Sequence, residues 1–239
     1  MTAAIIVQAR MHSTRLPGKV LLKLGEETVL HHVLRRCAAV EGCDVVVCAI
    51  PEAADCDPIA DEAKRAGAVA IRGSETDVLG RYYKAATAVD ATIIMRVTSD
   101  CPLIDPTVGG EVLALRAREH ADYACNNMPP SFPHGLDCEA FTFAALETAA
   151  KAATENFDRE HVTPWLRRNE SMKRANLAAP TREFSAQRWT LDFPEDYEFF
   201  RAVRAKLPPR ELVGWREVAA LVANDPTLAA INARHARPQ

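Results

Sequence analysis

Continuous apolar runs alternate with helical patterns through the first hundred residues of this chain. Runs rich in Ala, Val and Ile cover 3–7, 44–50, 68–72 and 91–97. Segments with apolar residues at helical spacing lie between them at 28–40, 57–67 and 76–89. Strands that are buried on both faces of a sheet read as continuous apolar runs. The alternation therefore predicts an α/β fold, with a mostly parallel sheet covered by helices on both faces.

The second half of the chain is less regular. The segment 126–135, NNMPPSFPHG, is rich in Pro and Asn and predicts a long loop of the kind that forms lids or binding loops. We expect helices at 143–153, 161–169, 194–206 and 215–223 and a further strand at 188–193. No repeat or linker interrupts the chain, so we predict a single domain over residues 1–239.

Composition and charge give no sign of a nucleic-acid partner, a membrane partner or a disulfide framework. The formal net charge of −3 gives no global attraction to nucleic acid or to an anionic membrane. The apolar runs are too short to span a bilayer, and the first residues lack a signal-peptide pattern. The seven cysteines include no pair at CxxC spacing, which favours reduced thiols over a disulfide framework or a zinc site. These features predict a cytoplasmic protein.

The loop after the first apolar run is strongly basic. It reads QARMHSTRLPGK and places Arg10, Arg15 and Lys19 within ten residues. Ligands of parallel sheets bind beyond the carboxyl ends of the strands, which is where this loop must lie. Three cations there can converge on a polyanion, and Ser13 and Thr14 add hydroxyl donors.

The glycine spacing excludes two common phosphate-binding motifs. Gly18-Lys19 lacks the preceding glycine and the following Ser or Thr of a P-loop, and the loop contains no GxGxxG. Taken alone, the loop is explained equally well as an ordinary solvated surface segment.

Two aspartates strengthen the functional interpretation. Asp100 follows the strand predicted at 91–97, and Asp192 lies near the end of the strand predicted at 188–193. Each alone is typical of a helix cap or a turn. Both at the same rim could hold Mg²⁺, which takes one or two protein carboxylates and completes its shell with phosphate and water. A basic loop with two such carboxylates indicates phosphoryl or nucleotidyl transfer.

Six segments in order carry a family resemblance. They are QARMHSTRLPGK, RGSETDVLGRYYKAA, RVTSDCPLIDP, HGLDCEAF, REHVTPWL and TLDFPEDYEFF. With them the chain resembles the SpsF-type cytidylyltransferases of spore coat polysaccharide biosynthesis, over about residues 3–200. These are related to the 3-deoxy-manno-octulosonate and acylneuraminate cytidylyltransferases. The resemblance implies the nucleotide-diphospho-sugar transferase sandwich and a Mg²⁺-dependent reaction that joins CTP to an acidic sugar with release of pyrophosphate.

The resemblance also implies roles for individual residues. Catalysis would fall to Lys19, Arg15 and Asp100, and the metal to Asp100 and Asp192. Nucleotide contacts would come from Ala9, Arg10, Met11, Ser13, Thr14, Arg15, Lys19, Arg72, Gly73, Ser74, Asp77 and Thr98. Acceptor contacts would come from Gly135, Asp137, Glu139, Arg159 and His161.

The chain departs from the sugar-acid enzymes at two places. Thr98-Ser99 replaces the Gln-Gly pair that usually precedes their metal-binding Asp, and the acceptor half matches poorly. The acceptor is therefore not inherited from the resemblance. An acceptor oxygen would attack the α-phosphorus of CTP in line, and His161 and Asp137 are the candidates for a general base.

Two other functions compete with this interpretation. A glycosyltransferase uses a similar sandwich, although it commonly carries Asp-x-Asp where this chain has Asp100-Cys101-Pro102. A non-catalytic nucleotide sensor on the same scaffold would bind without turnover. A homodimer is implied by the resemblance and by no residue pattern.

Overall fold

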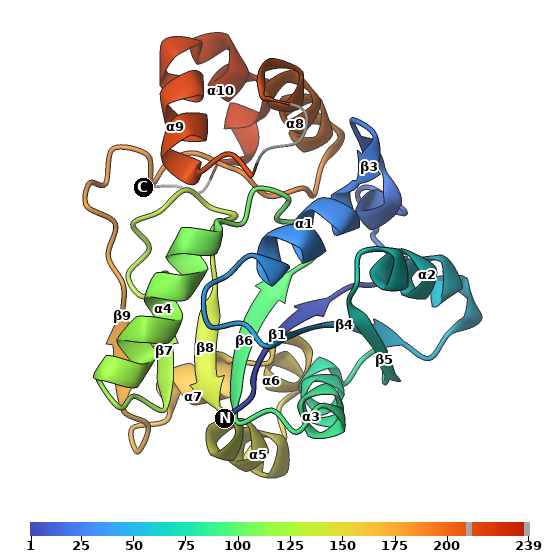
Figure 1. Ribbon diagram of the computed structural model, residues 1–239, viewed down its shortest axis with the longest axis vertical. Coiled ribbons are helices and arrows are strands. Elements are labelled where there is room, and N and C mark those ends of the chain that lie inside the picture. Colours follow the sequence, from blue (N-terminus) through green and yellow to red (C-terminus); the bar gives the residue numbers. More distant parts are fainter. Residues whose placement is uncertain (209–211, 237–239) are drawn as a thin grey trace.

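A seven-stranded sheet forms the centre of the molecule. The computed structural model describes residues 1–208 and 212–236 and is shown in Figure 1. The strands lie in the order β5 (Val69–Gly73), β4 (Val45–Pro51), β1 (Ala3–Gln8), β6 (Ile93–Thr98), β8 (Glu139–Thr142), β7 (Tyr123–Cys125) and β9 (Arg174–Asn176). The pairs β5–β4, β4–β1, β1–β6 and β7–β9 are parallel, and β8 runs antiparallel to both its neighbours. The predicted α/β class with a mostly parallel sheet is confirmed.

Helices cover both faces of this sheet. One face packs on α1 (Val29–Ala38), α2 (Asp57–Arg65) and α4 (Pro106–Arg118). The other packs on α3 (Val78–Ala88), α5 (Phe143–Ala152) and α7 (Pro164–Arg168), and α6 (Asn156–His161) lies against α3 and α7. Within β1, Ile5 and Val7 join the first core and Ala4 and Ile6 join the second. Because both faces are buried, the strand is apolar from Ala3 to Val7, which is the pattern that the sequence displays.

The predicted elements of the first half are confirmed to within a few residues. The strands expected at 3–7, 44–50, 68–72 and 91–97 are β1, β4, β5 and β6, and the helices are α1, α2 and α3. Side-chain caps define two of these starts, since Thr28 accepts from the His31 amide and Asp77 from the Gly80 amide. The sequence interpretation missed α4 and the short hairpin of β2 (Lys23–Leu24) and β3 (Glu27–Thr28).

Three predictions in the second half need correction. Residues 188–193 form no strand, because only Arg188 makes an isolated bridge, to His134. The helix expected at 161–169 is two short helices, α6 and α7, and the chain turns between them at Val162. Strands β7, β8 and β9 were not anticipated, and at three or four residues each they are too short to show a period. Residues 126–138 form a loop, as expected at 126–135.

Three helices at the carboxyl end of the sheet complete the fold. They are α8 (Pro194–Lys206), α9 (Trp215–Asn224) and α10 (Pro226–Asn232), drawn together at the top of Figure 1. The helix expected at 194–206 matches α8, and the one at 215–223 matches α9 to within a residue. Trp215, Val218 and Leu228 join the first core from this side. These helices therefore rest over the rim where β1 and β6 end.

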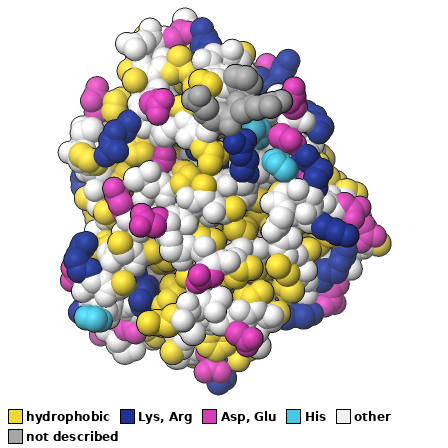
Figure 2. All heavy atoms as spheres, viewed as in Figure 1, with side chains coloured by type: hydrophobic (Ala, Val, Ile, Leu, Met, Phe, Trp, Pro, Cys, Tyr) yellow, Lys and Arg dark blue, Asp and Glu magenta, His cyan; other side chains and the backbone are white. Residues whose placement is uncertain are grey.

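The surface carries charges of both signs. Figure 2 shows the face that bears α1 and α4, where acidic and basic side chains are scattered with hydrophobic ones between them. Among the described residues, no helix combines the length and the apolar character that a membrane crossing requires. The seven cysteines are all free, and six of them are buried.

Candidate active site

The basic loop closes on itself and turns Lys19 toward the rim of the sheet. The Gly18 amide donates to Met11 O at 3.2 Å, which joins the two arms of the loop. Gly18 has a φ of 66°, a left-handed conformation that a residue with a Cβ adopts only with strain. The helical turn Lys19–Leu21 starts directly after it. The glycine thus sets the direction in which the lysine leaves the loop.

Lys19 is held between the two aspartates. Its Nζ donates to Asp100 Oδ2 at 2.9 Å, to Asp192 Oδ1 at 2.9 Å and to Leu191 O at 2.7 Å. Burial alone would lower the pKa of Lys19, but the two carboxylates outweigh it and raise that pKa. Burial would likewise raise the pKa of each aspartate, and the charge of Lys19 lowers both. All three groups are therefore charged at neutral pH.

Asp100 and Asp192 reach each other by different routes. Asp100 lies two residues beyond the end of β6, as the strand-end rule predicts. Asp192 lies in an extended segment outside the sheet, so that rule does not place it. Instead the Leu191 amide donates to Asp100 O at 2.8 Å, and the Trp189 amide donates to His134 O at 2.6 Å. Backbone hydrogen bonds of the segment thus bring the second carboxylate to the first.

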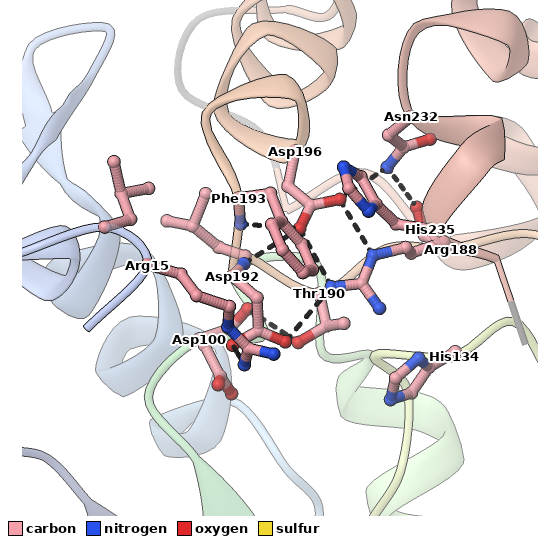
Figure 3. A network of polar contacts seen from close by, with 12 residues as sticks. Arg15, Asp100, His134, Arg188, Thr190, Asp192, Phe193, Asp196, Asn232 and His235 are labelled. Carbon is pink, nitrogen blue, oxygen red and sulfur yellow. Dashed lines mark hydrogen bonds and ion pairs between the residues drawn. The ribbon is translucent and has the colours of Figure 1, made fainter. Parts of the chain in front are cut away.

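A buried network behind Asp192 fixes its orientation (Figure 3). Asp196 in the first turn of α8 is fully buried and accepts from the Arg188 guanidinium at 2.8 and 2.9 Å. It also accepts from the backbone amides of Asp192 and Phe193 at 2.9 and 3.0 Å. Arg188 Nη2 then donates to Asp192 Oδ2 at 3.0 Å. Asn232 at the end of α10 closes the network by donating to Asp196 Oδ1 at 3.0 Å.

Loss of the Asp196 carboxylate should be costly for stability. We expect Asp196→Ala to lower the free energy of unfolding by about 3–5 kcal/mol, since it leaves a buried guanidinium without its main partner. Urea denaturation measures the change. Glu198→Ala, on an exposed position of the same helix, is the matched control and should change little. A loss of under about 1 kcal/mol in Asp196→Ala would contradict the network's structural importance.

Arg15 adds a further cation at the same carboxylate. Its Nη2 lies 2.9 Å from Asp192 Oδ1, and its guanidinium carbon lies 4.7 Å from the centroid of the Phe193 ring. His235 stacks on Phe193 with the ring centroids 3.7 Å apart. The Arg15 side chain remains half exposed. It can therefore turn from Asp192 toward an anionic ligand while its guanidinium stays in contact with water.

A cavity of about 590 Å³ opens in front of Lys19. Most residues predicted for the loop and the rim line it: Ala9, Arg10, Met11, Ser13, Thr14, Arg15, Lys19, Thr98, Asp100, Asp192 and His161. A second group of predicted residues does not: Arg72, Gly73, Ser74, Asp77, Gly135, Asp137, Glu139 and Arg159. The structure therefore brings together the residues that we assigned to phosphate and metal. Most of the residues that we assigned to the base and the acceptor do not line the cavity.

Several of the residues outside the cavity have clear structural partners. Arg72 pairs with Asp57 at 2.5 Å on the surface. Asp77 caps α3 and forms an ion pair with Arg159. A Cβ on Gly135, whose φ is 118°, would lie 2.0 Å from Trp189 O. That position must be glycine for the 126–138 loop to pass beside the segment that leads to Asp192.

Glu139 lies behind the wall and holds an arginine that reaches the cavity. It is buried on β8 and pairs with Arg96 and Arg167, each at 2.6 Å. Burial alone would raise its pKa, but the two arginines lower it to about 2. Arg96 lines the cavity and donates from Nε to Gln8 Oε1 at 3.3 Å.

His161 lies at the mouth of the cavity on a strained turn. It is the last residue of α6, where the sequence had predicted the start of a helix. Buried Val162 follows with φ 71° and ψ −56°, and the Thr163 amide donates to His161 O at 2.9 Å. A β-branched residue in this region costs about 1–3 kcal/mol. Such strain is concentrated at functional sites, which supports the assignment of His161 to ligand binding.

Sequence reasoning missed two arginines in the cavity wall. Arg96 interrupts the apolar strand β6, and a lone charge inside such a strand is a signal that could have revealed it. Arg81 lies on α3, and its position in the sequence looks like an ordinary charged helix face. Both line the cavity beside Gln8 and Thr98.

One group of possible metal ligands lies elsewhere. Glu27, His31 and Glu62 have ligand atoms within 4.8 Å of one another. Arg65 pairs with both glutamates and lowers the pKa of Glu62 to about 2, with Thr28 as a further donor. The guanidinium already occupies both carboxylates of this cluster.

Comparison with known proteins identifies relatives along nearly the whole chain. The spore coat polysaccharide biosynthesis protein SpsF of Bacillus subtilis is 33% identical over 94% of this chain and 95% of its own length. A solved cytidylyltransferase structure from Leptospira borgpetersenii superimposes with a TM-score of 0.91 at 30% identity, covering 96% of this chain and 97% of that one. The 3-deoxy-manno-octulosonate cytidylyltransferase of Maricaulis maris is 36% identical over 49% of this chain and 46% of its own length.

A family model agrees with these relatives. The model described as cytidylyltransferase matches residues 4–221, a span that contains the basic loop, Asp100 and Asp192. The geometry of a lysine between two carboxylates at a strand-end cavity thus lies inside the matched region. The chain is a nucleotidyltransferase that belongs to the cytidylyltransferase family.

Proposed function

We propose that this protein transfers CMP from CTP to an anionic sugar or a related acceptor, releases pyrophosphate, and uses Mg²⁺ held by Asp100 and Asp192. The observation that carries the proposal is the position of Lys19 Nζ, 2.9 Å from both carboxylates, at the wall of a cavity lined by Arg10 and Arg15. A triphosphate needs several cations at one end of its site, and this end of the cavity supplies them.

The two aspartates suit Mg²⁺. Asp100 Oδ2 and Asp192 Oδ1 accept from the same nitrogen, so they lie no more than twice 2.9 Å apart. Mg²⁺ binds oxygen ligands at about 2.0–2.1 Å and needs one or two carboxylates, with phosphate and water for the rest. The low pKa values of both aspartates keep them ionised and ready to ligate. The ion, when bound, would neutralise charge on the phosphate that is attacked.

The other charged side chains would act on the nucleotide directly. Lys19 and Arg15 give up their contacts to the aspartates and donate to the phosphate oxygens, where negative charge builds as pyrophosphate leaves. Ser13 and Thr14 offer hydroxyl donors beside them. His161 faces the same cavity from α6, and we assign it to the acceptor. Asp137 lies outside the cavity wall, so of the two candidate bases we retain His161.

The names of the relatives support a sugar-type acceptor. One relative is a protein of spore coat polysaccharide biosynthesis and another is a 3-deoxy-manno-octulosonate cytidylyltransferase. Arg96 and His161 at the wall would favour an acceptor that carries a negative charge. By the same resemblance we propose that the enzyme works in the cytoplasm as a homodimer.

Pyrophosphate release across four nucleoside triphosphates tests the proposal. Each is combined with a panel of sugar acids, sugar phosphates and phosphonates at a fixed Mg²⁺ concentration. We expect release with CTP well above that with UTP, ATP or GTP, and only with an acidic acceptor present. Equal use of ATP and CTP would show that the base assignment is wrong.

The same assay separates the alternative functions. A glycosyltransferase would use a finished nucleotide-sugar and release no pyrophosphate from CTP. A sensor would bind CTP in a calorimeter without any turnover. Two features favour CMP transfer over a glycosyltransferase and a sensor. The sequence Asp100-Cys101-Pro102 lacks the Asp-x-Asp of glycosyltransferases, and the cavity holds enough cations for a triphosphate.

A further inference from the structure

Arg81 is a buried charge in the wall of the cavity that no described carboxylate neutralises. Its side chain comes from the first turns of α3, one turn after Val78, and both residues line the cavity. Only 2% of Arg81 is exposed. Within residues 1–208 and 212–236, the one hydrogen bond of its side chain runs from Nη1 to Ser74 O at 2.6 Å, and Nε has no partner. Burial lowers the pKa of this guanidinium, which shows how poorly it is solvated.

Other buried arginines of this protein have carboxylate or carbonyl partners for more of their N–H groups than Arg81 has. Arg188 pairs with Asp192 and Asp196, and Arg96 pairs with Glu139. Arg36, which is 5% exposed, donates to the two carbonyls of Ile104 and Val213 from separate nitrogens. A guanidinium has five N–H donors, so Arg81 retains several that no described residue uses. A ligand in the cavity is the group that can satisfy them.

The position of Arg81 indicates which part of a nucleotide it meets. Arg10 is a charged neighbour of Arg81, and no described contact joins Arg81 to Lys19, Asp100 or Asp192. Uncharged wall residues lie around the same cavity, among them Ala9, Met11 and Val78. Apolar wall residues with a few polar groups placed among them are what a heterocyclic base requires. The phosphates have their own cations in Lys19 and Arg15.

We propose that Arg81 selects the base, by donating two hydrogen bonds to the N3 and O2 acceptors on the pairing edge of cytosine. Uracil carries a hydrogen on N3, which would face an arginine N–H and leave that donor unsatisfied, while only O2 could still accept. A fork of donors therefore distinguishes the two pyrimidines by more than their shape. This inference rests on the proposed function, because it assumes that a cytidine nucleotide occupies the cavity.

The inference also explains the RGSETD segment, which resembles a base-contacting motif yet lies outside the cavity. A Cβ on Gly73 would lie 3.1 Å from Arg81 Cγ, so the glycine leaves room for the arginine stem. Ser74 O accepts its one hydrogen bond, and Asp77 caps the helix from which it projects. The segment thus acts on the base indirectly, because its residues hold the Arg81 side chain in position.

The test compares kcat/KM for CTP and UTP in Arg81→Met and Arg81→Lys. The wild-type preference for CTP should fall about 10- to 100-fold in both variants, because neither side chain offers a planar fork of donors. Calorimetry of CTP and UTP binding gives the same ratio without turnover. The melting temperature of ligand-free Arg81→Met should be equal to or above that of the wild type, since the variant removes an unsatisfied buried charge. A structural role would instead lower it. Should Arg81→Met fail to fold, Arg81→Lys decides the question.

Arg36→Met is the matched control, since it removes a buried arginine of α1 that does not line the cavity. It should melt at a lower temperature and keep the wild-type ratio of CTP to UTP. A preference for CTP that persists in both Arg81 variants overturns this inference and leaves the proposed function standing. A wild-type enzyme that uses CTP and UTP equally also overturns it. A wild type that turns over no CTP with any acidic acceptor overturns the proposed function itself.

Discussion

Lys19→Ala is expected to lower kcat about 10²–10³-fold, the usual loss when one preorganised charge-stabilising donor is removed. The lysine is the point at which the basic loop meets the two aspartates, and its ammonium group makes three hydrogen bonds there. Because the loop is anchored separately by the contact between Gly18 and Met11, the fold should survive the substitution. Steady-state pyrophosphate release measures the rate, and circular dichroism checks the fold.

A second measurement on this position concerns the metal. Lys19 Nζ lies between the two carboxylates, so a divalent cation that binds both of them must displace it. Lys19→Met should therefore bind Mn²⁺ more tightly than the wild type when no nucleotide is present, as measured by electron paramagnetic resonance. Arg201→Met, at an exposed position of α8, should alter neither quantity. Turnover near the wild-type level in a folded Lys19→Ala protein would refute the assignment of this cavity as the active site.

Asp100→Asn and Asp192→Asn should each abolish most of the Mg²⁺-dependent turnover. Each substitution keeps the shape of the side chain and removes the charge that an ion requires. The structure places both carboxylates at 2.9 Å from one nitrogen, although 92 positions separate them in sequence. Because they would serve one ion, the double variant should lose little more than either single variant, as residues that act as a unit are not additive. Titration of Mg²⁺ against turnover should show weakened activation in both single variants.

The control for this pair is Asp55→Asn, which removes an exposed carboxylate that pairs with His12 beside the cavity. It should retain Mg²⁺ activation. Losses in the two single variants that multiply independently in the double variant would show that the aspartates do not share an ion. Unchanged Mg²⁺ activation in Asp192→Asn would assign the metal to Asp100 without its proposed partner.

The part of the site that could be predicted from the sequence is the part that lies at the ends of strands. Because β1 and β6 are continuous apolar runs, their ends are visible in the sequence, and the loop with Lys19 and the turn with Asp100 fall at those ends. Asp192 was predicted at the same rim for a reason that is wrong, since no strand precedes it. Its position depends on single hydrogen bonds such as Leu191 N to Asp100 O, which leave no periodic pattern.

The rest of the cavity wall could not be predicted for a related reason. Whether a charged helix residue faces solvent or a cavity depends on what packs beside the helix, and nothing near Arg81 in the sequence reports that. Glu139 is the opposite case, because its motif resembles an acceptor site while the structure buries it against Arg96 and Arg167. Motif order therefore identified the family, and tertiary contacts decided which members of each motif line the cavity.

The contact of Asn232 with Asp196 has a consequence for protein synthesis. A ribosome releases the chain from its first residue onward, so the basic loop and Asp100 emerge long before the buried network that orients Asp192 can close. At about 5–20 residues per second, the interval between residues 100 and 232 is on the order of ten seconds. During that time the second carboxylate is either not yet made or, once Asp192 has been added, not yet held in place by Asn232. Nucleotide chemistry should thus begin only after residue 232 has left the ribosome, when the last helix seals the site.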